Sequence, residues 1–183
     1  MATWNSRGLR GSALEEFINF SNETYRDKGL ALVQKIPTPI KPLKIDKSTS
    51  TITQAYFEKD STVDYIGVCQ GVPICFDAKE CAAEAFSFQN VHEHQFNFMK
   101  EFEAQDGVSF LIINFTAKNK FYYMRFRELE SFYNSIEAGL HPKNVLYDEL
   151  DESYFIPSSN GVIVHYLECV KKDLIGRETK DGR

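Results

Sequence analysis

The sequence contains no apolar run long enough to cross a bilayer, and its first residues lack the apolar core of a signal peptide. We therefore expect a cytoplasmic protein that makes no membrane contact. Its four cysteines, at positions 69, 75, 81 and 169, show neither the paired spacing of a metal site nor a disulfide framework, so we expect reduced thiols. The chain also has no glycine-rich phosphate loop and no Ser/His/Asp or Cys/His constellation for nucleophilic catalysis.

An excess of positive charge is missing as well. The net charge is −5, whereas basic patches usually supply most of a protein's nonspecific affinity for nucleic acid. The first 50 residues nevertheless carry eight Lys or Arg against five Asp or Glu, so all the net acidity lies later in the chain. A local basic arm on an acidic protein can still bind DNA.

The size and composition of the chain fit one ordinary domain. Its 183 residues, 43% of them hydrophobic, suffice for a single core. We expect one domain over residues 1–173, followed by a flexible, charged tail over residues 174–183.

The residues most suggestive of chemistry lie in a stretch from position 61 to position 95. Two runs rich in β-branched and apolar residues flank Gln70 and Gly71, which predicts a β-hairpin that turns there. Side chains alternate between the two faces of a strand, so Asp77 and Lys79 share a face, and a matching register puts Asp64 beside them. Such a group could hold Mg²⁺ against a phosphodiester, although acid-x-Lys also occurs as a plain charge pair on a solvated strand.

Hydrophobic periodicity predicts the elements around this hairpin. We expect helices at 13–28, at about 89–106 and at 129–138, strands at 30–36, 51–57, 108–115, 120–126 and 161–167, and a loop at 80–87. Ser12 and Glu15 have capping-box spacing, so Glu15 either caps the first helix or adds a carboxylate to the site. His92 and His94 would point about 200° apart on a helix, which favours surface histidines over paired ligands.

A second hairpin is expected between positions 37 and 57. Three prolines between positions 37 and 42 forbid a helix and favour a rigid, extended path. With the polar turn at 48–50 and the extended run at 51–57, this predicts a projecting stalk. The stalk carries Lys41, Lys44 and Lys47, and Lys35 lies just before it. These lysines would either contact phosphates or keep a surface loop soluble.

Several blocks resemble, in order and spacing, the signature of the RecU family of Holliday-junction resolvases, within the PD-(D/E)xK nuclease superfamily. The resemblance covers roughly residues 5–170, through Arg10-Gly11, Leu14-Glu15-Glu16, Lys35-Ile36-Pro37-Thr38-Pro39-Ile40, Ala55-Tyr56-Phe57, Ser61-Thr62-Val63-Asp64-Tyr65, Phe76-Asp77-Ala78-Lys79-Glu80, Gln89-Asn90-Val91-His92-Glu93-His94-Gln95 and Ala104-Gln105-Asp106-Gly107. It implies an α/β fold of the restriction-endonuclease-like type: a mixed central sheet flanked by helices, with a proline-rich stalk that reaches into the four-way junction.

The resemblance also implies a function: a Mg²⁺-dependent endonuclease that makes paired nicks in Holliday junctions during recombination and DNA repair. Paired nicks on opposing strands call for two active sites, so a symmetric homodimer is expected. Recombinase and branch-migration proteins are candidate partners.

Site residues follow from the same resemblance. Asp64 and Asp77 would be metal ligands, and Thr62, through its backbone carbonyl, and Gln95 would complete the metal site. Lys79 would stabilise the charge on the phosphate in the transition state, and the catalytic candidates are Asp64, Asp77, Lys79 and Glu15. Contacts to DNA would come from Arg10, Lys35, Lys41, Lys44 and Lys47.

One departure from the family pattern concerns Asp77, because family members usually carry glutamate there. Aspartate reaches one methylene less far, so we expect Mn²⁺ to support more activity than Mg²⁺. Two alternatives remain open at this point. One is a junction-binding protein that modulates a recombinase without cleaving, and the other is a nuclease of the same superfamily that acts on a different DNA.

Overall fold

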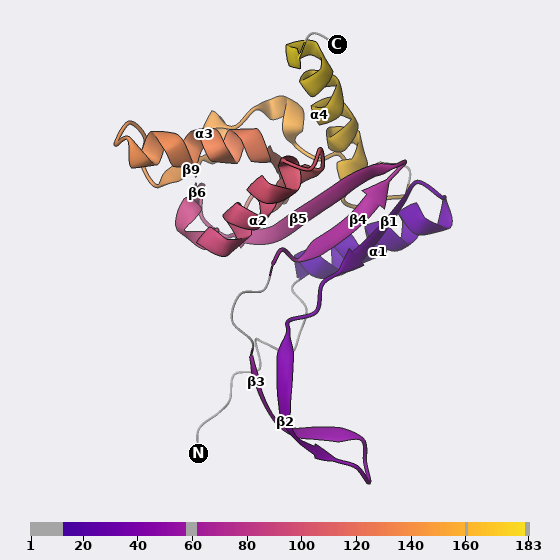
Figure 1. Cartoon of the computed structure of the whole chain (residues 1–183). Coiled ribbons are helices and arrows are strands. Elements are labelled where there is room, and N and C mark those ends of the chain that lie inside the picture. The colour runs from indigo at the N-terminus through magenta and orange to yellow at the C-terminus, as the bar shows by residue number, and fades with distance from the viewer. Residues whose placement is uncertain (1–12, 58–61, 160, 182–183) are drawn as a thin grey trace.

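A five-stranded mixed sheet lies at the centre of the computed structural model, which describes residues 13–57, 62–159 and 161–181 (Figure 1). The strand order is β1-β4-β5-β7-β8, and all neighbours are antiparallel except β5 and β7. The strands are β1 Ala31–Lys35, β4 Tyr65–Cys69, β5 Val72–Cys81, β7 Val108–Phe115 and β8 Lys120–Arg125. Helices flank this sheet, so the expected α/β fold class is confirmed.

Helices cover both faces of the sheet. On one face α1 and α4 meet through the rings of Tyr25 and Tyr166, whose centroids are 5.2 Å apart. On the other face α2 and α3 meet through Phe96 and Phe126, at 5.3 Å. Their bounds are α1 Ala13–Asp27, α2 Glu93–Glu103, α3 Phe126–Glu137 and α4 Tyr166–Asp181. None of the helices within the described residues combines the length and apolar character that crossing a membrane requires.

The β4–β5 hairpin forms where the sequence predicts it. Gln70 and Gly71 both have positive φ angles, 50° and 89°, as a two-residue turn of type I′ requires. The register pairs Tyr65 with Phe76, and the next positions along the two strands are Asp64 and Asp77. The predicted juxtaposition of the two aspartates is therefore confirmed at the level of the backbone.

A row of aromatic rings stabilises this part of the sheet. Tyr65, Phe76, Phe110 and Tyr123 stack across β4, β5, β7 and β8, with successive centroids 4.7, 4.7 and 4.3 Å apart. All four side chains are fully buried under α1 and α4. Because Phe76 packs toward this face, its neighbour Asp77 must point to the opposite face, which α2 covers.

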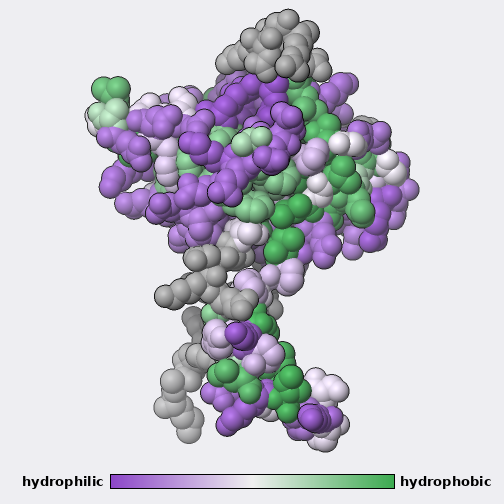
Figure 2. All heavy atoms as spheres, viewed as in Figure 1, coloured by the Kyte–Doolittle hydropathy of each residue, from purple (hydrophilic) through white to green (hydrophobic). Residues whose placement is uncertain are grey.

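The stalk projects from the body of the protein, as predicted (Figure 1). It is the hairpin of β2 Ile40–Asp46 and β3 Thr51–Phe57, and all of these residues except Asp46 are exposed. Exposed hydrophobic side chains lie beside hydrophilic ones along it (Figure 2): Ile40, Leu43, Ile45, Ile52, Tyr56 and Phe57. An exposed apolar surface of this kind marks a segment that contacts something outside its own core.

The C-terminal segment differs from the expectation. The strand expected at 161–167 is wrong, because that stretch forms only an isolated bridge between Ser159 and Val162 before α4 begins at Tyr166. The flexible tail expected from 174 is wrong, because α4 continues to Asp181. Two of its polar side chains contact the rest of the domain. Asp173 is fully buried, accepts from Tyr123 (3.2 Å) and pairs with Arg127 (2.8 Å). Arg177 pairs with Glu103 at 2.7 and 2.8 Å. The extent of the domain beyond this helix stays a prediction.

Smaller shifts occur around β5. The loop expected at 80–87 is wrong at its start, because β5 continues to Cys81 along β7. The loop also contains a strand, β6 Ala85–Ser87, which pairs with β9 Asn144–Leu146. Short 3₁₀ helices lie at Phe88–Asn90, Tyr147–Glu149 and Glu152–Tyr154. The helix expected from about 89 therefore begins only at Glu93.

Candidate active site

Three side chains from β5 and α2 form the centre of the site. Asp77 is fully buried, and Gln95, in the first turn of α2, donates from Nε2 to Asp77 Oδ1 at 2.7 Å. Lys79 Nζ lies 2.6 Å from Asp77 Oδ2 and donates to Gln95 Oε1 at 3.1 Å. The structure thus brings together the predicted acid, lysine and glutamine.

Asp64 completes this group from the neighbouring strand. It lies just before β4, and its Oδ2 accepts a hydrogen bond of 3.0 Å from the backbone N–H of Ala78. The Asp64 carboxylate is therefore held beside the acid-x-Lys motif, because Ala78 is the residue between Asp77 and Lys79. Thr62 is half-buried two positions earlier in the chain.

The electrostatics of the site favour a bound cation. Burial, followed by the nearby Asp64 carboxylate, raises the pKa of Asp77 to about 7, although the Lys79 ammonium opposes the rise. Asp77 Oδ2 is buried, and the Lys79 ammonium, 2.6 Å away, is its ion-pair partner. A buried carboxylate next to a second carboxylate suits a hard divalent ion, which would compete with the Lys79 ammonium for Asp77 Oδ2.

The number of protein ligands limits what that ion could be. Within the described part of the chain, no group of three or more His, Cys, Asp or Glu side chains is arranged to hold a metal ion. A site built on two carboxylates must fill its other positions with backbone oxygen, water or substrate phosphate, as Mg²⁺ sites do. The donor set therefore fits Mg²⁺ or Mn²⁺ and is unlike a closed structural zinc site.

Glu15 lies at the start of α1 and pairs with Lys35, at 2.6 Å between Oε2 and Nζ. Burial, and then the charges of Glu15 and Asp64, raise the pKa of Tyr65, so both carboxylates lie near the same phenol. The Leu14 N–H donates to Glu80 Oε1 at 3.3 Å, so Glu80 caps this end of α1. Ser12, the other half of the expected capping box, lies outside the described residues.

The remaining predicted DNA contacts are spread along the stalk. Lys41 and Lys44 belong to β2 and Lys47 to the turn after it, and all three are exposed. Lys35 lies at the base of the stalk, at the end of β1, where it pairs with Glu15. Arg10 lies outside the described residues.

The geometry expected of His92 and His94 is wrong. Their rings stack with centroids 5.5 Å apart instead of pointing in opposite directions. The reason is that His92 is the N-cap of α2 and has extended backbone angles, φ −75° and ψ 149°. Helical spacing therefore does not apply to this pair. His92 is exposed and His94 half-buried.

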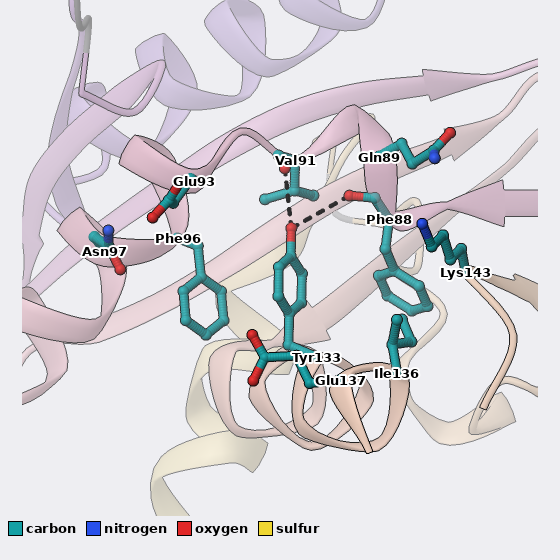
Figure 3. Close-up of a pocket in the computed structure, with 10 residues that line it drawn as sticks. All are labelled: Phe88, Gln89, Val91, Glu93, Phe96, Asn97, Tyr133, Ile136, Glu137 and Lys143. Carbon is teal, nitrogen blue, oxygen red and sulfur yellow. Dashed lines mark hydrogen bonds between the residues drawn. The ribbon is translucent and has the colours of Figure 1, made fainter. Parts of the chain in front are cut away.

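A cavity of about 530 Å³ lies between α2 and α3, but it is not the active site (Figure 3). Tyr133 crosses it and donates to the carbonyls of Val91 (2.9 Å) and Phe88 (3.3 Å). The residues that line it include none of the four at the site centre: Phe88, Gln89, Val91, Glu93, Phe96, Asn97, Tyr133, Ile136, Glu137 and Lys143. Asp64, Asp77, Lys79 and Gln95 therefore lie apart from this hollow.

Sequence reasoning missed two contacts of the site. Glu80 caps α1, and the backbone N–H of Ala78 holds Asp64. Neither contact has a signal in the sequence, because the first joins residues 66 positions apart and the second uses a backbone group. Both residues do lie within the block around Asp77 that resembles the family signature.

Comparison with known proteins agrees with the resemblance. The family profile described as "RecU: Recombination protein U" matches residues 9–172. The Holliday junction resolvase RecU of Pediococcus pentosaceus is 39% identical over 169 residues, which cover 90% of this chain and 84% of that protein. The Holliday junction resolvase RecU of Geobacillus kaustophilus is 40% identical over 166 residues, covering 88% and 82%. Among solved structures, the Holliday junction resolvase Hjc of Archaeoglobus fulgidus aligns with 60% of this chain and 77% of its own, at 4% identity and a TM-score of 0.37. By the span of the profile match and by these identities, the chain belongs to the Recombination protein U (RecU) family.

Proposed function

We propose that the protein is a Holliday junction resolvase: a metal-dependent endonuclease that makes paired nicks in four-way DNA junctions during recombination and repair. The observation that carries this proposal is the cluster of Asp64, Asp77 and Lys79 at the end of the β4–β5 hairpin. It occurs in a chain whose curated relatives are named as Holliday junction resolvases.

In this proposal Asp64 and Asp77 hold the ion, together with the backbone carbonyl of Thr62. The burial of Asp77 next to the Asp64 carboxylate supports this assignment. Mg²⁺ is the expected ion, and the short reach of Asp77 favours higher activity with Mn²⁺. When bound, such an ion lowers the pKa of a water and offsets the charge of the phosphodiester. Gln95 could join the ligands through Oε1, which faces the Lys79 ammonium at 3.1 Å, while its Nε2 donates to Asp77 Oδ1.

The protein's own residues have separate tasks. Lys79 carries the positive charge that stabilises the phosphate as negative charge builds up on it, and it orients the attacking water. Asp77, with its pKa near 7, must stay ionised to bind a cation, so metal binding releases a proton at neutral pH. Glu15 is proposed as a further carboxylate of the site, because it and Asp64 both lie near Tyr65.

Binding of the junction is assigned to the stalk and the basic N-terminal part. Lys41, Lys44 and Lys47 would contact phosphates, together with Lys35 and Arg10. Two nicks on opposing strands require two active sites, so we propose a homodimer with twofold symmetry. Recombinase and branch-migration proteins are proposed as further partners, in a cytoplasmic setting.

The test of this proposal is the Lys79→Ala variant. We expect it to lose cleavage of a synthetic four-way junction by at least about 100-fold, as enzymes do when a charge that stabilises the transition state is removed. Its affinity for the same junction on a native gel should stay within about threefold of the wild type, since one cation contributes little to the total. Lys100→Ala is the matched control, because Lys100 lies on α2 and pairs with Glu130 at 3.3 Å. Equal cleavage by Lys79→Ala and the wild type would contradict the assignment.

Asp77 itself favours one alternative function. An aspartate where relatives of this type usually carry glutamate would suit a protein that binds junctions and modulates a recombinase without cutting. A wild-type protein that shifts the junction on a gel but never cleaves it, and an Asp77→Glu variant that does cleave, would support this alternative.

A further inference from the structure

The backbone around His92, just before α2, is held by contacts on both sides. Tyr133 of α3 donates to the carbonyl of the buried Val91 at 2.9 Å (Figure 3). The His92 N–H donates to Gln95 Oε1 at 3.1 Å, and the His92 carbonyl accepts from the Gln95 N–H at 3.0 Å. These contacts fix where the His92 backbone lies.

The same contacts put His92 next to the lysine of the site. Gln95 Oε1 accepts from Lys79 Nζ at 3.1 Å as well as from the His92 N–H, so the two donors share one acceptor atom. Two donors on one oxygen lie close to each other. His92 is therefore a neighbour of the group that is proposed to stabilise the phosphate in the transition state.

The His92 ring has a fixed orientation but does not serve the helix. Histidine is not among the favoured N-cap residues, and within the described part of the chain its side chain makes no hydrogen bond that caps α2. The residue is exposed, and its ring stacks on that of His94 with 13° between the planes and 5.5 Å between the centroids. The stack restricts the directions in which the ring nitrogens can point.

DNA near the cut needs hydrogen-bond donors from the body of the protein. The lysines of the stalk lie on a hairpin that projects from this body (Figure 1), and all the net acidity of the chain lies after residue 50. The aspartates of the site repel a phosphate unless an ion offsets them. An imidazole N–H next to Lys79 can donate to a phosphate oxygen, and contacts to phosphates are what set the position of DNA on a protein.

We propose that His92 binds the cut strand by donating from its imidazole to a phosphate next to the one that is attacked. His94 holds the ring by stacking on it. The contact fixes the strand relative to Lys79, and a misplacement of about 1 Å at a reacting centre can cost about 100-fold in rate. This inference rests on the proposed function and deepens it.

The test combines a protein variant with a change in a single phosphate. His92→Phe keeps a flat ring to stack on His94 but cannot donate. On the unmodified junction we expect it to lower kcat/KM by about 10-fold, as the loss of one hydrogen bond to a charged group does. The Kd for Mn²⁺ of the DNA-free protein, followed by the electron paramagnetic resonance signal of free Mn²⁺, should stay within about threefold of the wild type, because the imidazole is not a ligand in this proposal.

A neutral methylphosphonate then replaces, one at a time, each phosphate that flanks the cut. One of these replacements should lower kcat/KM of the wild type by about 10-fold and that of His92→Phe by less than about threefold, because the variant has already lost the contact. His141→Phe is the matched control and should follow the wild type on every DNA. That histidine lies beyond α3, where its ring packs on Phe132 with centroids 4.9 Å apart.

The outcomes separate the inference from the proposed function. Equal kcat/KM of His92→Phe and the wild type on the unmodified junction would overturn the inference, and so would methylphosphonates that slow both proteins by the same factor. A Kd for Mn²⁺ that rises more than about tenfold in His92→Phe would place His92 in the metal site and would also overturn it.

A wild type that never cleaves would refute the proposed function but not end the test. Binding on a native gel then replaces cleavage, with single methylphosphonates placed in turn around the crossover, and equal losses of affinity for both proteins would overturn the inference. If His92→Phe does not fold, His92→Ser takes its place, because serine is a favoured N-cap residue and lacks the ring.

Discussion

The buried Asp77 makes the stability of the metal-free protein depend on pH in a defined direction. Its pKa is about 7 in the folded chain and about 3.9 in an unfolded one, so between these values the folded state binds more protons. Stability must then fall as the pH rises through this window, and the full cost is present above pH 7. The cost grows from roughly 1 to 2 kcal/mol at pH 5 to roughly 4 kcal/mol at pH 8, a loss of roughly 2 to 3 kcal/mol.

Urea unfolding in the presence of a chelator, at pH 5, 6, 7 and 8, measures this loss. Other groups also titrate in this range, so the comparison is with Asp77→Asn, which cannot ionise and should lack roughly 2 to 3 kcal/mol of the wild-type pH dependence. Asp27→Asn, at the exposed end of α1, is the control and should follow the wild type. If Asp77→Asn shows the wild-type pH dependence to within about 0.5 kcal/mol, the assignment of a raised pKa to Asp77 is refuted.

Two further predictions concern the C-terminal helix and the stalk. Arg177→Ala should lower the free energy of unfolding in urea by about 3 kcal/mol, because it leaves the buried Asp173 and the half-buried Glu103 with less compensating charge. Arg26→Ala, at an exposed position, is the control. An unchanged urea midpoint for Arg177→Ala would contradict this prediction. Replacing the stalk residues Lys41, Lys44 and Lys47 by alanine should make the binding constant for the junction less dependent on salt. The magnitude of the slope of log K against log salt should fall by about 2 to 3, and an unchanged slope would contradict phosphate contacts there.

The centre of the site was predictable because it depends on local rules. Strand alternation puts Asp77 and Lys79 on one face, and the chemistry of the Gln70-Gly71 turn fixes the register that brings Asp64 next to Asp77. The stalk was predictable for a similar reason, since closely spaced prolines leave the backbone few conformations.

The errors fall where contacts between distant residues decide the structure. The tail expected from 174 is helical, and its Arg177 bonds with Glu103, 74 positions earlier, a contact that a polar run of sequence does not reveal. The relation of His92 to His94 was wrong because the start of α2 was placed too early, so that helical geometry was applied to an N-cap residue. The orientation of the Gln95 amide follows only from its three partners.

The central claim is tested most directly by incubating the protein with an end-labelled four-way junction, beside a linear duplex of the same arms, with Mg²⁺, with Mn²⁺ and with a chelator. The account predicts paired nicks near the crossover, faster with Mn²⁺ than with Mg²⁺, and neither nicks with the chelator nor nicks in the duplex. Equal cleavage of the duplex would point to a nuclease with another DNA substrate. A junction that is bound but uncut with either ion would contradict the claim that Asp64, Asp77 and Lys79 form the active site of a resolvase.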